Sequence, residues 1–217
     1  MSALSVVTRW WSLLACVLFL SGCQSTYYNA MEKVGYAKRD ILVDRVEDAT
    51  ETQAEVKEQF QSAYQAFNAL LKLEGSELEA RYETLNDAYE DSRDKAEELS
   101  DRVEAIESVA DALFDEWRDE LNQYSSKSLR DSSARKLRET QSRYNQYLKS
   151  LKRAEAKVEP VLAVFKDQVL YLKHNLNAEK VSALKGEVGR FNSDVKGLVQ
   201  EMDRSIEQAR QFIQGLD

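Results

Sequence analysis

The sequence predicts an all-α protein: an elongated antiparallel four-helix bundle with coiled-coil packing, preceded by an N-terminal signal peptide. The chain has one Pro and seven Gly among 217 residues, and 31% of its residues are charged. This composition is typical of long helices, because residues that break helices are scarce. Apolar side chains also recur at alternating steps of three and four residues, the seam spacing of a left-handed coiled coil.

The first 22 residues are predicted to be a secretion signal. A short segment with one positive side chain, Arg9, precedes an apolar run over residues 10–20. About eleven apolar residues suit the hydrophobic region of a signal peptide. They are too few to span a bilayer, which takes roughly 20.

The apolar run ends in Leu20-Ser21-Gly22-Cys23, which resembles the lipobox of bacterial lipoproteins. We therefore expect Cys23 to be acylated with palmitate and to become the mature N-terminus. The alternatives are an ordinary cleavage site beside a chance Cys, or a rival lipobox that ends at Cys16 and would cut the apolar run in half. In the lipoproteins that this segment resembles, Asp after the Cys favours the inner membrane, so Gln24 indicates an outer-membrane anchor facing the periplasm.

The expected domains are the signal peptide (1–22), an acylated Cys with a short tether (23–28) and one helical bundle (29–217). Within the bundle, breaks at Gly75, at Ser125–Ser128 and at Asn175–Asn177 separate four helical segments. Short connections make neighbouring helices antiparallel. A three-helix bundle with a peripheral fourth segment is the alternative. The four segments cover residues 27–73, 77–124, 129–174 and 178–214.

Glycine and proline raise two local questions. Gly189, Ser193 and Gly197 form a ridge of small residues that indicates either close helix packing or a helix that can loosen. Gly186 further weakens this last segment, because Gly in a helix interior costs about 1 kcal/mol relative to Ala. Pro160 is expected to kink or restart the third segment, because it lacks an amide hydrogen.

Charge is distributed unevenly along the chain. Residues 87–120 contain 14 acidic and four basic side chains, whereas residues 127–157 contain ten basic and three acidic ones. An antiparallel hairpin places these stretches side by side, where complementary charges select partner and orientation. A basic face toward anionic lipid or a cell-wall polymer is the alternative. The net charge of −8 argues against nucleic-acid binding.

The sequence contains no recognisable catalytic or metal-binding pattern. The single histidine, His174, lies where the third helix should end, and there it can interact favourably with the helix dipole. Neither cysteine lies in the helical body. We therefore expect no enzyme activity, no catalytic residue, no metal and no cofactor. An enzyme with a site made only of carboxylates is the alternative.

The most apolar part of the body is Pro160–Asn177. Its seam requires Phe165 and Val169, but further apolar side chains widen the stripe around much of the helix. This width indicates either a core buried on several sides or a patch that binds a partner. The possible partner-binding residues are Leu162, Leu170 and Tyr171.

Three segments carry a resemblance to a known family: residues 31–49 (MEKVGYAKRDILVDRVEDA), 111–121 (DALFDEWRDEL) and 159–178 (EPVLAVFKDQVLYLKHNLNA). They resemble an uncharacterised family of proteobacterial lipoproteins with a coiled-coil-rich domain of unknown function. The resemblance implies a helical lipoprotein and brings no activity, ligand or catalytic residue.

We therefore expect a non-enzymatic envelope lipoprotein that acts as a helical spacer, scaffold or adaptor. Its expected partners are the membrane that holds the anchor and other envelope proteins, peptidoglycan or a second copy of itself. A carrier of an apolar ligand or lipid within the bundle is the alternative function.

Overall fold

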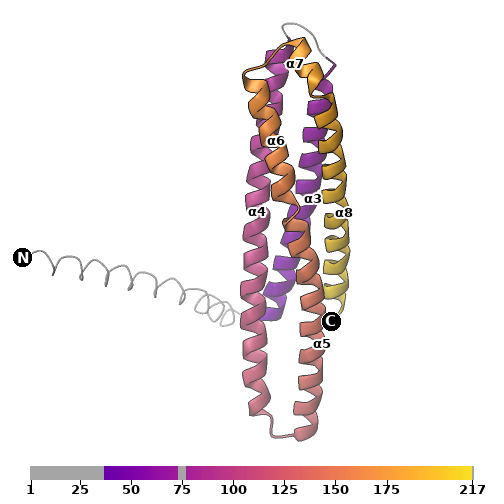
Figure 1. Cartoon of the computed structure of the whole chain (residues 1–217). Coiled ribbons are helices and arrows are strands. Elements are labelled where there is room, and N and C mark those ends of the chain that lie inside the picture. The colour runs from indigo at the N-terminus through magenta and orange to yellow at the C-terminus, as the bar shows by residue number, and fades with distance from the viewer. Residues whose placement is uncertain (1–36, 73–76, 217) are drawn as a thin grey trace, which may run out of the picture.

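The computed structural model describes residues 37–72 and 77–216. Four long helical stretches pack against one another and alternate in direction (Figure 1), which confirms the predicted all-α bundle. The third stretch consists of two helices, and a short helix precedes the last one. The elements are α3 (Lys38–Leu70), α4 (Glu77–Glu120), the 3-10 turn η1 (Leu121–Gln123), α5 (Lys127–Glu155), α6 (Val158–Lys173), α7 (Ala178–Ala183) and α8 (Lys185–Gln214).

The predicted seams form the core. Every seam position of α3 from Leu42 to Leu70 is buried, and so is every seam position predicted from Leu137 to Leu172. Four seam positions of α4 are only half-buried, namely Tyr82, Tyr89, Ala96 and Trp117. The spacing of apolar residues therefore identified the buried face of each helix, because steps of three and four keep side chains on one stripe.

The break between α5 and α6 follows from Pro160. Pro160 lies in the first turn of α6, and the two helices are separated at Ala156 and Lys157. A continuous helix would need an amide hydrogen at position 160 to bond the carbonyl of Ala156, and proline cannot supply one. The prediction that Pro160 restarts the helix is confirmed.

Helix α5 begins at Lys127, two residues earlier than predicted. Ser126 is its N-cap, and the Ser126 Oγ accepts a hydrogen bond from the Leu129 amide at 3.4 Å. A serine hydroxyl is well suited to pair an amide that has no partner within the first turn. The predicted break at Gly75, by contrast, lies outside the described residues.

The core is divided into two clusters along the bundle. The end of the bundle that carries the α3–α4 and α6–α7 connections is called the turn end. One cluster lies toward this end and includes Phe60, Phe67, Phe165 and Phe191. The other lies toward the α4–α5 connection and includes Tyr144, Tyr147 and Phe212. Between the two clusters on α3 lies Gln53, a fully buried polar residue in the seam.

The glycines of α8 are not packed closely. A β-carbon added at Gly186, Gly189 or Gly197 would have no atom within 4 Å other than near neighbours along the chain. The interpretation of this ridge as a close contact is therefore wrong. The glycines face open space because the buried stripe of α8 runs along Val188, Phe191 and Val195 instead.

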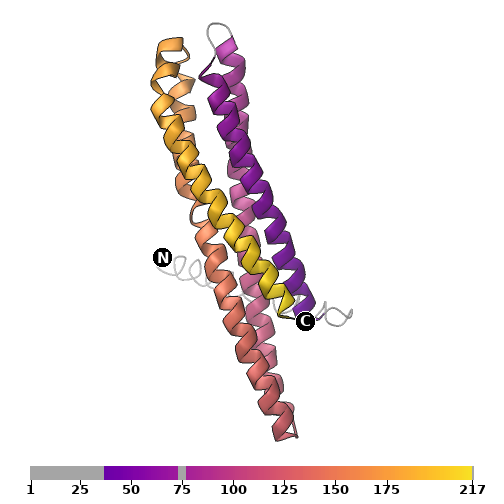
Figure 2. The same cartoon turned by 90° about the vertical axis from the view of Figure 1, so that its right-hand side faces the viewer.

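The α4–α5 hairpin projects beyond the other helices (Figures 1 and 2). At the start of α3, the Lys38 side chain reaches Glu116 near the end of α4, where its Nζ lies 3.0 Å from the carboxylate. The end of α8 is held beside α5, where Arg143 Nη1 donates to the Gly215 carbonyl at 3.1 Å. Beyond these contacts only two helices remain. We call residues 118–132 the hairpin tip.

Candidate interaction surfaces

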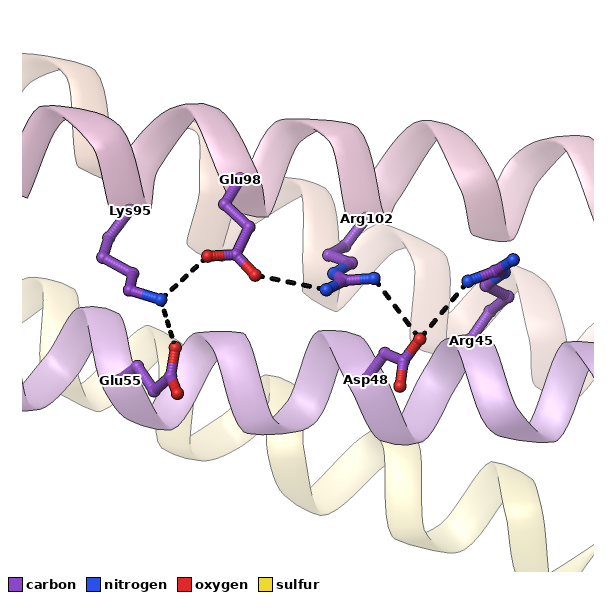
Figure 3. Close-up of polar contacts among 6 residues, drawn as sticks. All are labelled: Arg45, Asp48, Glu55, Lys95, Glu98 and Arg102. Carbon is purple, nitrogen blue, oxygen red and sulfur yellow. Dashed lines mark hydrogen bonds and ion pairs between the residues drawn. The ribbon is translucent and has the colours of Figure 1, made fainter.

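An ion-pair ladder joins α3 to α4 along one edge of the bundle (Figure 3). At one end the Lys95 Nζ lies 2.6 Å from the Glu55 carboxylate and 2.8 Å from that of Glu98. Arg102 continues the ladder, since it lies 3.2 Å from Glu98 on its own helix and 3.4 Å from Asp48 on α3. Alternating acids and bases thus cross between the two helices.

The ladder shifts the pKa values of its members. Hydrogen bonds from Lys95 and then from Arg102 lower the pKa of the Glu98 carboxyl. Hydrogen bonds to Glu55 and Glu98 raise the pKa of the Lys95 ammonium. All of these side chains are about one-third exposed or more, so solvent screens the pairs strongly. The ladder therefore fixes how α3 and α4 align more than it adds stability.

The predicted charge complementarity between α4 and α5 produces few direct ion pairs. The two helices run side by side and antiparallel, as expected. Within the described residues, one ion pair joins them: Lys152 Nζ to Glu107 at 2.5 Å. The basic residues of α4 instead pair with acids on α3 or on α4 itself. Among the described residues, direct ion pairs therefore make little of the predicted complementarity between α4 and α5.

The three predicted partner-binding residues do not share one surface. Leu162 is only 6% exposed and belongs to the turn-end core, because α6 packs against both α4 and α8. Leu170 and Tyr171 are 51% and 37% exposed. The wide apolar stripe of α6 thus contains buried core residues and one exposed pair. Leu162 is thus largely buried while Leu170 and Tyr171 are exposed, and partner binding at these residues stays a prediction.

A second exposed apolar pair, which the heptad pattern does not predict, lies at the hairpin tip. Tyr124 is 41% exposed and Leu129 is 60% exposed. Leu129 lies in the first turn of α5, two turns before the first seam residue, Leu137. In the sequence, Leu129 follows a polar turn and lies outside the heptad seam, and this position could have indicated an exposed apolar residue.

Grooves between the helices are lined by both charged and apolar side chains. The groove between α3 and α8 is lined by Glu51, Lys57, Asp203 and Arg210, among others. A second groove lies at the break between α5 and α6, where Ala156 and Leu162 form part of the wall.

Several buried polar atoms have no hydrogen-bond partner. They include both amide atoms of Gln53, the hydroxyl of Tyr147 and the hydroxyl of Ser205. Burial raises the pKa of the Tyr147 hydroxyl, and it also raises that of Tyr144, to which Glu107 and Asp111 contribute. Such atoms cost stability, because each has given up water without gaining a partner.

Over 37–72 and 77–216, no group of three or more His, Cys, Asp or Glu residues could hold a metal ion. No helix within these ranges is long and apolar enough to cross a membrane. His174 is the C-cap residue of α6, the position that the sequence predicted.

Comparison with known families identifies the bundle. A family described as "protein of unknown function (DUF2959)" matches residues 27–216. The chain belongs to this family. No curated protein matches the chain.

The DUF2959 match covers every helix that the structure describes. Cys23 and the predicted signal peptide precede both the matched residues and the described residues. Acylation of this DUF2959 protein at Cys23 therefore stays a prediction from the sequence.

Proposed function

We propose that this DUF2959 protein is a non-enzymatic envelope lipoprotein, anchored by acylated Cys23 in the outer membrane. Its bundle would act on the periplasmic side as a spacer, scaffold or adaptor. The partners would be other envelope proteins, peptidoglycan or a second copy. Gln24 supports the outer membrane over the inner membrane, through the resemblance of Leu20–Cys23 to a lipobox.

One observation carries this proposal: the anchored end and the exposed apolar pair of α6 lie far apart. The chain from Cys23 enters the bundle at Lys38, near the hairpin end. Leu170 and Tyr171 lie in the last turn of α6, near the turn end. Helix α3 has 33 residues and runs most of the distance between them, about 50 Å. An anchored bundle would therefore hold this pair well away from the membrane.

The packing of the turn end supports a rigid spacer. Phe165 lies 5.1 Å from Phe191 and 5.6 Å from Tyr89 between ring centroids, and all of the turn-end phenylalanines are fully buried. Interdigitated aromatic rings fill the space between the helices and resist bending. This filled core favours a spacer over a carrier that would hold a ligand inside the bundle.

Anchoring is tested by labelling cells with a clickable palmitate analogue and separating the membranes. We expect wild-type protein and Cys16→Ser to be labelled and to fractionate with the outer membrane. Cys23→Ser should lose both the label and membrane retention. Labelled Cys23→Ser alongside unlabelled Cys16→Ser would instead assign the anchor to Cys16.

The adaptor role is tested with a photocrosslinking amino acid at position 171. The matched control is position 166, an exposed lysine on the same helix. We expect envelope partners to crosslink at 171 and not at 166, and we expect Leu170→Ser to weaken the crosslinks. Equal crosslinking at both positions would contradict a specific surface at Tyr171.

A further inference from the structure

The hairpin tip lies at the end of the bundle where the chain from Cys23 enters. The Lys38 side chain, at the start of α3, reaches along α4 to Glu116, and the hairpin continues beyond Glu116 for about 12 Å through the end of α4 and η1. The fourteen residues 24–37 can span at most roughly 50 Å. A bundle anchored at Cys23 can therefore stand with its hairpin tip on the membrane surface.

The tip has little to bury inside the protein. Every residue from 118 to 132 is exposed except Leu121, which is half-buried. The base of the hairpin is closed by the Trp117 Nε1, which donates to the Ser133 hydroxyl at 2.8 Å. Beyond this bond, Tyr124 and Leu129 extend into solvent without an intramolecular core to cover them.

The charges of the tip suit a zwitterionic surface. Residues 118–131 hold three basic and three acidic side chains, so the tip has no net charge. The first turn of α5 contains Lys127 and Arg130 but no acidic residue. Acids are the residues that normally stabilise this end of a helix, because the helix dipole is positive there. Arg130 lies 3.9 Å from Asp131, and both side chains are about half exposed, so the guanidinium stays accessible to an external anion such as a lipid phosphate.

We propose that the hairpin tip contacts the phospholipid surface that holds the anchor, with Tyr124 and Leu129 entering the headgroup region. Tyr suits this interface because its ring is apolar and its hydroxyl is polar. Lys127 and Arg130 would pair with lipid phosphates. Two apolar side chains bind a membrane weakly, but the anchor makes the contact intramolecular and raises its effective concentration. The bundle would then be held perpendicular to the membrane by two attachments, the acyl chains on Cys23 and the hairpin tip.

This inference rests on the proposed anchor, so the test supplies an anchor chemically. Protein 23–217 has Cys23 as its single thiol and Trp117 as its single tryptophan. The thiol is coupled to a maleimide phospholipid in vesicles of phosphatidylethanolamine and phosphatidylglycerol. Tyr124→Trp is made in a Trp117→Phe background, and the matched control is Tyr171→Trp in the same background. Quenching by brominated acyl chains reports contact with the bilayer.

We expect brominated lipid to reduce the fluorescence of Trp at position 124 and to leave Trp at position 171 unchanged. Adding Leu129→Ser should weaken the quenching at 124. Coupled protein with no quenching at 124 would overturn the inference. Equal quenching at both positions would also overturn it, because the bundle would then lie flat. Quenching at 124 that appears only at high protein density would mean that crowding, and not the anchored tip itself, brings the residue to the bilayer, and it would likewise overturn the inference.

Hydrogen exchange provides a second measurement if Trp117→Phe loosens the hairpin. In unsubstituted protein 23–217, amides 124–131 should exchange more slowly when Cys23 is coupled to the vesicle than when it is not. Unchanged exchange would overturn the inference. Failure of Cys23 acylation in cells would refute the proposed anchor and leave this assay unaffected. Failure of the tip contact on coupled protein would leave the anchor unaffected, so the two proposals fail separately.

Discussion

The two ends of the bundle are built on different principles. At the turn end, side chains from four helical stretches meet around fully buried phenylalanines such as Phe60, Phe165 and Phe191. At the hairpin tip only α4 and α5 remain, and Leu121 is the one half-buried side chain of residues 118–132. Two helices cannot enclose a core, so each apolar residue at the tip stays in contact with water. The turn end thus contributes a packed core, and the tip provides an exposed surface.

This comparison also separates the two exposed Tyr and Leu pairs. Leu170 and Tyr171 lie on the outside of a helix whose other face is packed. Tyr124 and Leu129 lie where almost nothing is packed. The two pairs have similar exposure and composition but different surroundings, which makes each a natural control for the other.

The largest expected effect distinguishes the two ends by stability. Phe165→Ala should lower the free energy of unfolding by about 3–5 kcal/mol, because it leaves a cavity among buried rings. Leu129→Ala at the tip should change it by less than about 0.5 kcal/mol. Urea denaturation followed by circular dichroism measures both. Similar losses in the two variants would contradict the proposed division.

The next effect concerns α8. Replacing Gly186, Gly189 and Gly197 together with Ala should raise the free energy of unfolding by about 0.5–1 kcal/mol for each residue. The added methyl groups enter open space in a helix, so no clash offsets the gain. Thermal or urea denaturation measures the change. Destabilisation would mean that these positions are packed in solution. Higher stability with weaker crosslinking at position 171 would instead mean that α8 must loosen in order to work.

A smaller effect is expected from Tyr147, in the cluster nearer the hairpin. Tyr147→Phe should stabilise the protein by about 1 kcal/mol, because the hydroxyl is buried without a partner. The ring contact with Phe212, with centroids 5.7 Å apart, should be retained. A loss of stability would show that the hydroxyl has a partner in solution, such as a bound water molecule.

The same variant changes the response to alkaline pH. Burial raises the pKa of Tyr147, so the folded state keeps its proton when the unfolded state, with a pKa of about 10, loses it. The free energy of unfolding should therefore be unaffected by this tyrosine below pH 10. Above pH 10 it should fall by about 1.4 kcal/mol per pH unit for each such tyrosine. Tyr147→Phe should reduce this slope, and Tyr144 should account for part of the remainder. Denaturation at several pH values from 9 to 11 measures both slopes.

The ion-pair ladder should contribute less than about 1 kcal/mol through Glu98, because its pairs are exposed. The pKa of Glu98 is lowered in the folded state. The contribution of Glu98 is therefore present above the unfolded pKa of about 4.3 and is lost as the pH falls below that value. Glu98→Gln should therefore be less stable than wild type at pH 7 and equal to it at low pH. Glu97→Gln is the control, since within the described residues Glu97 has no ion pair. Equal effects of both substitutions at pH 7 would contradict a role for the ladder.

The smallest effect tests the exposed pairs directly. Leu170→Ser with Tyr171→Ser, and Tyr124→Ser with Leu129→Ser, should each change stability by no more than about 0.5 kcal/mol. The first pair should reduce partner crosslinking and leave quenching at the tip unchanged. A loss of stability well beyond this range in either variant would mean that the pair is buried in solution by contacts between protein molecules.

The sequence by itself determined which residues form helices and which face of each helix is buried. Apolar residues at steps of three and four must lie on one stripe, so the burial of Leu42, Phe165 and Val195 could be predicted before any neighbour was known. The restart at Pro160 was equally local, since it follows from one missing amide hydrogen. Acylation of Cys23 is a prediction of the same local kind, and it is still to be tested.

The tertiary structure alone decided which residues lie opposite one another. Heptad spacing gives the direction in which a side chain points but not the register between helices, because shifting a helix by seven residues preserves the pattern. Register sets where α3 begins alongside α4 and leaves Tyr124 and Leu129 beyond the core. Because α6 packs between α4 and α8, Leu162 is buried while Leu170 on the same helix is exposed. The arrangement of the helices also leaves open space around Gly189. Burial depends on how many helices surround a residue, and that number is a property of the assembled bundle.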